Sequence, residues 1–231
     1  MPYSEFIRSI FCGHNLDTSN NRWRIILFSL ITIAITNLIL EMISWATGFH
    51  SMTENIADLQ YSPSIFNLIF VVAIMPLIEE STFRLFLSGK PYHVLLSLSL
   101  LFSTFLSWII IVILQNQVVH HFIWIIGIFM FIFINALLYF RLSFMQKPPF
   151  YLSVTMFVKD NVRICFFISS LLFAISHILF LQLYTEVSTL ILGLLFIHYF
   201  IHGIILAFIR LQINFAAAFI FHAILNLLTF I

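Results

Sequence analysis

Long apolar runs dominate this chain of 231 residues and restrict its fold more than any other feature. A helix needs about 20 apolar residues to cross the roughly 30 Å hydrocarbon core of a bilayer. Hydrophobic residues make up 62% of the chain and charged residues only 8%, against about 25% charged in a soluble domain. We therefore expect an all-α fold, a polytopic transmembrane helical bundle. The seven predicted spans cover about residues 25–46, 65–87, 94–114, 122–140, 162–183, 190–209 and 215–231.

The basic residues indicate how these spans are oriented, because cytoplasmic loops and flanks collect Lys and Arg. With seven spans, every Lys and Arg falls on one side of the membrane. The charged residues of the loops on the other side are all acidic, namely Glu54, Asp58 and Glu186. The N-terminus is therefore predicted to be cytoplasmic. We expect a cytoplasmic segment over residues 1–24 and one membrane domain over residues 25–231.

The predicted second span contains three charged residues within two helical turns, in the sequence EESTFR over residues 79–84. Each ionised side chain near a bilayer centre costs about 2.5–3.5 kcal/mol on insertion scales, so such residues persist only where they face a protein interior or a water-filled cavity. Glu79 and Glu80 cannot both ionise freely there, so one is expected to keep a proton while Arg84 supports the other. This arrangement suits a general base.

Each of two later spans carries a histidine one helical turn from a second residue of interest. His177 follows Phe173 by four residues, and Asn226 follows His222 by four, so the members of each pair share a helix face. A carboxylate beside an imidazole can take a proton from water, while a second imidazole and an amide can stabilise the oxyanion formed at a carbonyl. We therefore predict hydrolysis of a peptide bond within the membrane, with Phe173 packing in the core beside His177.

Other polar residues of the predicted spans have no clear part in this chemistry. His198 and His202, four residues apart in the sixth span, are expected to form helix–helix contacts of the kind common in membranes. Glu41, near the outer end of the first span, either pairs with a histidine of the sixth span or reaches the membrane interface. The sequence does not choose between these two roles for Glu41.

The three motifs, in this order on separate spans, resemble the signature motifs of the CPBP (Abi) family of intramembrane proteases. That family includes the CAAX prenyl-protein endopeptidases and bacterial relatives linked to bacteriocin processing and self-immunity. The resemblance covers about residues 73–231. The motifs are Glu79-Glu80-x-x-x-Arg84, Phe173-x-x-x-His177 and His222-x-x-x-Asn226.

The resemblance implies a CAAX-type intramembrane protease in a bacterial inner (plasma) membrane. Its substrate would be a protein or peptide, either lipid-modified or of the bacteriocin leader type. Glu79 and His177 would activate the attacking water, and His222 and Asn226 would stabilise the oxyanion. Glu80 and Arg84 would shape and support the site, with Glu80 alternatively acting as a second ligand or a proton relay.

The resemblance leaves open whether a metal takes part, since either a carboxylate or a bound ion could activate the water. Two carboxylates and two histidines form a plausible shell for Zn²⁺ or another divalent metal, although no helix carries the His-Glu-x-x-His motif of zincins. The ligands would be Glu79, Glu80, His177 and His222.

A different class of function also fits these residues. The acids and histidines could serve as a proton relay in a proton-coupled transporter, or bind a partner in a non-catalytic membrane immunity protein. The expected partners are the substrate and membrane lipids. A formal net charge of +1 with no basic patch beyond the residues that orient the spans argues against nucleic-acid binding.

Overall fold

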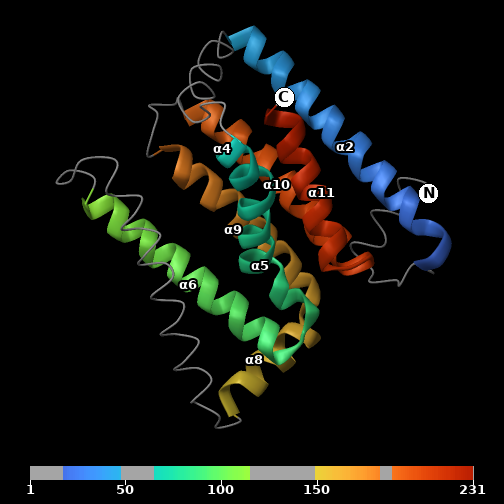
Figure 1. The fold of residues 1–231 in the computed structure, drawn as a ribbon, viewed down its shortest axis with the longest axis vertical. Helices are drawn as coiled ribbons and strands as arrows, with labels where there is room; N and C mark the ends of the chain where they lie inside the picture. Colours follow the sequence, from blue (N-terminus) through green and yellow to red (C-terminus); the bar gives the residue numbers. More distant parts are fainter. Residues whose placement is uncertain (1–17, 48–64, 115–148, 183–188, 231) are drawn as a thin grey trace. The chain divides into compact units, whose positions relative to one another are not determined.

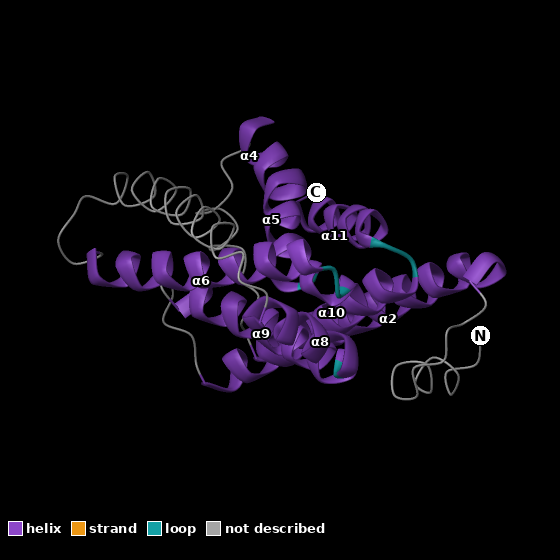
Figure 2. Ribbon diagram, turned by 90° about the horizontal axis from the view of Figure 1, so that it is seen from below, coloured by secondary structure: helices purple, strands orange, loops and turns teal. Residues whose placement is uncertain are grey.

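The computed structural model describes residues 18–47, 65–114, 149–182 and 189–230, and every element in these ranges is helical (Figure 2). The predicted all-α class is therefore confirmed for this part of the chain. The predicted span over residues 122–140 lies outside the described residues. Contacts group the chain into two compact units, with divisions after Glu80 and after Cys165. The prediction of one membrane domain over residues 25–231 stays a prediction.

The first unit contains the helices that bring the sequence motifs together. In it, α10 packs against α2 and α11, and α11 packs against the π-helix η1 (Figure 1). Its elements are α2 (Thr18–Thr47), α4 (Ile65–Ile69), η1 (Phe70–Ile74), the start of α5 (Met75–Phe83), most of α9 (Val162–Gln182), α10 (Thr189–Gln212) and α11 (Phe215–Phe230).

Small and hydroxyl-bearing residues shape the helices of this unit. A Cβ added at Gly203 of α10 would lie 3.0 Å from both the Cα and the carbonyl oxygen of Ser170 on α9, so the two backbones approach closely there, as small residues allow in packed apolar helices. On α2, the hydroxyls of Thr32 and Thr36 donate to the carbonyls four residues earlier, at 2.9 and 2.7 Å. These bonds satisfy polar groups that an apolar surrounding would otherwise leave unpaired.

The helix that enters the acidic motif changes its winding just before Pro76. The sequence predicts one span over residues 65–87, whereas the structure has α4, the π-helical turn η1, α5, and then a 3₁₀ segment, η2 (Leu85–Ser88). Proline lacks a backbone N–H and its ring clashes with the carbonyl four residues earlier, and a local widening to π-helix is one way to relieve that clash. The uninterrupted helix expected from hydropathy is therefore corrected to a helix with a π-helical turn and a 3₁₀ end.

The second unit contains the end of α5, η2, α6 (Pro91–Leu114), α8 (Pro149–Asp160) and the start of α9. Gly89 follows η2 with a φ of 62°, a left-handed conformation that favours glycine, and a Cβ there would meet Lys159 Cγ at 3.0 Å. The Ser97 hydroxyl donates to the Thr82 carbonyl. The 12-residue α8 has no counterpart among the predicted spans and is too short to cross a bilayer.

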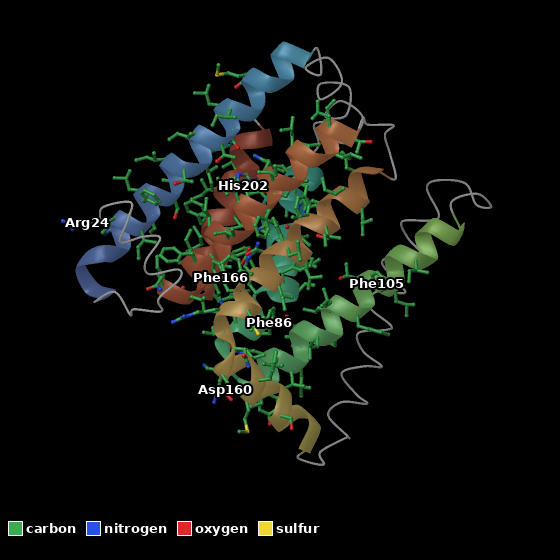
Figure 3. All side chains as sticks on the ribbon, turned by 180° about the vertical axis from the view of Figure 1, so that it is seen from behind. Arg24, Phe86, Phe105, Asp160, Phe166 and His202 are labelled. Carbon is green, nitrogen blue, oxygen red and sulfur yellow. The ribbon has the colours of Figure 1, made fainter. Side chains whose placement is uncertain are left out.

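Two described helical segments are long and apolar enough to cross a membrane, Val162–Leu179 and Thr189–Gln212. Shorter apolar helices cover Trp23–Ile39, Pro91–Leu106 and Phe215–Leu228. On α2, Arg24 is exposed (Figure 3), as are several large apolar side chains. Seven spans and a cytoplasmic N-terminus remain predictions.

Candidate active site

One imidazole, that of His222 on α11, lies between the two adjacent carboxylates of α5. His222 Nδ1 is 3.0 Å from Glu80 Oε1, a hydrogen bond, and His222 Nε2 is 3.4 Å from Glu79 Oε2. The side chains are 6% exposed for His222, 14% for Glu79 and 0% for Glu80. Because a carboxylate accepts hydrogen bonds, Nδ1–H is the donor to Glu80. This bond fixes the ring and turns Nε2 toward Glu79.

His177 on α9 approaches the same Glu79 oxygen from another helix. Its Nδ1 donates to the carbonyl oxygen of Phe173, one turn earlier, at 2.9 Å. A carbonyl can only accept, so the neutral ring carries its lone pair on Nε2. That Nε2 lies 3.9 Å from Glu79 Oε2, too far for a direct hydrogen bond.

Two aromatic rings hold the His177 imidazole in place. The buried Phe173 ring lies 4.3 Å from it between centroids, as the predicted packing beside His177 requires, and Phe173 also makes an edge contact with His222 at 5.8 Å. Tyr199 of α10 stacks on the imidazole at 4.4 Å with an interplanar angle of 29°. The ring is thus oriented by one hydrogen bond, one stacked ring and one tilted ring.

Glu79 Oε2 is the atom on which this arrangement centres. It is buried and has no hydrogen-bond partner within the described part of the chain. Two imidazole Nε2 atoms lie 3.4 and 3.9 Å from it. If both rings are neutral in the tautomers given above and Glu79 is ionised, three acceptors face one another. Such a group is stable only with an added proton or a donating water between its members.

Asn226 is the predicted site residue whose amide is engaged elsewhere. Its Nδ2 donates to the backbone carbonyl of Val71, in η1, at 2.9 Å. Asn226 lies one turn after His222 on α11, as the motif spacing predicts. Its predicted role at the oxyanion stays a prediction.

The two arginines near the acidic motif belong to different units. Arg84 follows α5 in the second unit and is buried, and its predicted support of Glu80 stays a prediction. Arg210, in the last turn of α10, interacts electrostatically with Glu80, and its guanidinium carbon lies 5.3 Å from the centroid of the Phe215 ring. From the sequence, Arg210 is expected only to orient its span, like the other basic residues. Its position just before the helix that carries His222 was the available signal.

The α10 histidines form a second polar cluster. His198 and His202 have ring centroids 4.1 Å apart, and Tyr199 meets His198 edge-on at 5.4 Å (Figure 3 labels His202). His198 Nδ1 is buried and has no hydrogen-bond partner in the described ranges. Glu41 is exposed on α2.

The predicted metal ligands meet in pairs, through hydrogen-bond and ion-pair distances of 3.0 to 3.9 Å. His222 Nδ1 is bound to Glu80, and its Nε2 faces the same Glu79 oxygen that His177 Nε2 approaches. Within the described residues, no group of three or more His, Cys, Asp or Glu side chains is arranged to hold a metal ion. The prediction of Zn²⁺ or another divalent metal stays a prediction.

No family model, curated protein or solved structure matches this chain. The candidate site is therefore defined by the sequence motifs and by the geometry of Glu79, Glu80, His177 and His222. The resemblance to the CPBP (Abi) proteases stays a prediction.

Proposed function

We propose that this chain is an intramembrane endopeptidase of the CPBP (Abi) type, in which Glu79 and His177 activate water for attack on a peptide bond. The observation that carries the proposal is the state of Glu79 Oε2. It is a buried carboxylate oxygen without a hydrogen-bond partner in the described part of the chain, and two imidazole Nε2 atoms face it. Purely structural polar residues in apolar helices normally pair their oxygens.

A water molecule completes this group. The 3.9 Å between Glu79 Oε2 and His177 Nε2 is too long for a direct bond, but a water about 2.8 Å from each atom can donate one hydrogen to the carboxylate and one to the imidazole. Both acceptors then draw protons from the same oxygen, which makes that oxygen nucleophilic. The water is also held in one place, which removes part of the entropic barrier to attack.

The proposed reaction follows from these positions. The water oxygen bonds to the carbonyl carbon, and its proton passes to the Glu79 and His177 pair. The carbonyl oxygen becomes an oxyanion, which a protonated His222 stabilises by donating from Nε2. The pair then gives the proton to the departing nitrogen, the C–N bond breaks, and the products are a carboxylic acid and an amine.

Glu80 keeps His222 in the orientation that this step needs. Its carboxylate accepts from Nδ1–H at 3.0 Å and is fully buried. A buried carboxylate behind an imidazole fixes the tautomer and stabilises the imidazolium when it forms, as in the acid–histidine pair of serine proteases. The electrostatic interaction of Arg210 with Glu80 lowers the cost of burying that negative charge.

The proposed substrate is a protein or peptide that reaches the site in an apolar environment. Two described helices are long and apolar enough to cross a membrane, and large apolar side chains are exposed on α2, α6, α9, α10 and α11. Lipid-modified CAAX peptides and bacteriocin-type leader peptides are the two substrate classes that follow from the motif resemblance.

Cleavage of a peptide panel tests this proposal. Purified protein in liposomes is given prenylated CAAX peptides and unmodified leader-type peptides, with and without a chelator, and products are identified by mass spectrometry. We expect cleavage by the wild type, loss with Glu79→Gln, and no change with Glu41→Gln, which alters an exposed carboxylate in the same way. Loss of cleavage on chelation would mean that a metal ion, and not a carboxylate, activates the attacking water. Proton uptake without cleavage of any peptide would favour the transporter.

A further inference from the structure

The carbonyl of Val71 loses the donors that a regular helix would give it. In an α-helix this oxygen accepts from the N–H of Met75, and in a π-helix from that of residue 76. Here the Met75 N–H donates to the carbonyl of Phe70, and residue 76 is a proline without an N–H. The π-helical turn η1 and Pro76 together therefore remove both intrahelical partners of Val71.

A side chain from α11 supplies the missing donor. Asn226 Nδ2 lies 2.9 Å from Val71 O, across 155 positions of sequence. A partly buried carbonyl without a partner is costly in an apolar surrounding. We propose that Asn226 is a positioning residue, whose amide takes the place of the N–H that Pro76 lacks and fixes the π-helical turn against α11.

The bond has a direct consequence for the acidic residues. One turn before Asn226, α11 carries His222, which binds Glu80, so two bonds join the η1–α5 stretch to α11. Val71 precedes Glu80 while Asn226 follows His222, so the two segments run in opposite directions where they meet (Figure 1). The His222 bond holds this helix contact at the acids, and the Asn226 bond holds it at its other end, at Val71. With both ends held, Glu79 is limited in how far it can slide along α11. Only this catalytic consequence rests on the proposed function.

A double-mutant cycle with Pro76 tests whether the Asn226 amide takes the place of a backbone N–H as the donor to Val71 O. Pro76→Ala restores an N–H: in a π-helix the new N–H reaches Val71 O, and in an α-helix the Met75 N–H does. In either case Val71 no longer needs Asn226. We expect Asn226→Leu to lower the melting temperature in detergent by about 2–6 °C in the wild type, and by less than about 1 °C in the Pro76→Ala background.

The matched control is Asn161→Leu. Asn161 Nδ2 also donates to a backbone carbonyl, that of Phe157, at 3.0 Å, but this bond does not involve Pro76. Its effect on the melting temperature should be the same in both backgrounds. An equal effect of Asn226→Leu in both backgrounds would overturn the proposal. The melting cycle needs no substrate, so it gives an answer even if no peptide is cleaved.

Activity separates the positioning role from an oxyanion role. If Asn226 positions the site, Asn226→Leu lowers kcat by a smaller factor in the Pro76→Ala background than in the wild type. If it donates to the oxyanion, the factor is the same in both, and the proposal fails.

Hydrogen exchange gives a second readout that does not depend on the Pro76→Ala protein folding. Asn226→Leu should speed exchange in peptides that contain residues 70–77 and leave peptides from the second unit unchanged. Unchanged exchange over residues 70–77 would contradict the proposal.

Discussion

The acid–histidine cluster of Glu79, Glu80, His177 and His222 and the histidine pair of α10 both contain imidazoles close to other titratable groups, but the groups that face those imidazoles differ. His177 is oriented by its bond to a backbone carbonyl and by two aromatic rings, and its Nε2 faces a carboxylate. His198 and His202 face each other, and His198 Nδ1 has no hydrogen-bond partner in the described ranges. The difference shows that a buried carboxylate aimed at fixed imidazoles, and not the number of histidines, identifies the candidate site.

The largest expected difference between the two clusters lies in the loss of each histidine. His177→Ala should lower kcat by about 10²- to 10⁴-fold, the usual contribution of a general base, whereas His198→Ala should change it by less than about threefold, because His198 meets the rings of Tyr199 and His202 and not the carboxylate that His177 faces. Steady-state cleavage of the best peptide from the panel measures both. Similar losses in the two variants would mean that the clusters act together.

Tyr199 connects the two clusters, since its ring contacts both His177 and His198. Tyr199→Leu removes the stack on His177 and should lower kcat about tenfold with little change in KM, in keeping with about 0.5–1.5 kcal/mol for an aromatic contact. Tyr199→Phe keeps the ring and should stay within about threefold of wild type. If the phenylalanine variant is as slow as the leucine variant, the hydroxyl matters and the stack does not.

The smallest expected effect concerns stability, and it comes from the packing of the helices that carry the two clusters. Gly203→Ala places a Cβ 3.0 Å from the Ser170 backbone and should destabilise the protein by about 1–3 kcal/mol. Gly193→Ala on the same helix meets nothing within 4 Å and should stabilise it by about 0.5–1 kcal/mol through helix propensity. Melting temperatures in detergent compare the two, and equal shifts would show that α9 and α10 do not approach closely.

Sequence alone predicted much of the local structure, because hydropathy and helical spacing are local signals. The predicted ranges 94–114, 190–209 and 215–231 correspond to α6, α10 and α11. His177 and His222, which the chemistry of buried polar residues grouped with the acids, lie near them in the structure. It did not predict α8, whose 12 residues carry Lys159 and Asp160 and lack the length of a span. Span number and orientation stay predictions.

The remaining features depend on contacts between distant residues, which local patterns do not encode. Pro76 signals a disturbance in its helix, but a π-helical turn with its free carbonyl bound by Asn226 depends on a partner 155 positions away. Tyr199 looked like one more aromatic residue of an apolar helix, and Arg210 like a residue that orients a span. The ring contact of Tyr199 with His177 and the electrostatic interaction of Arg210 with Glu80 arise only once the helices pack.

The most direct test of the proposed chemistry is the turnover of Glu79→Asp in liposomes, compared with wild type and with Glu41→Asp as the exposed control. The shorter side chain keeps the charge but withdraws the carboxylate by about one bond from the two imidazoles, and a displacement of about 1 Å can cost 10²-fold in rate. We predict a loss of about 10²-fold for Glu79→Asp and none for Glu41→Asp. Full turnover of Glu79→Asp would contradict the claim that the position of Glu79 Oε2 between His177 and His222 drives catalysis.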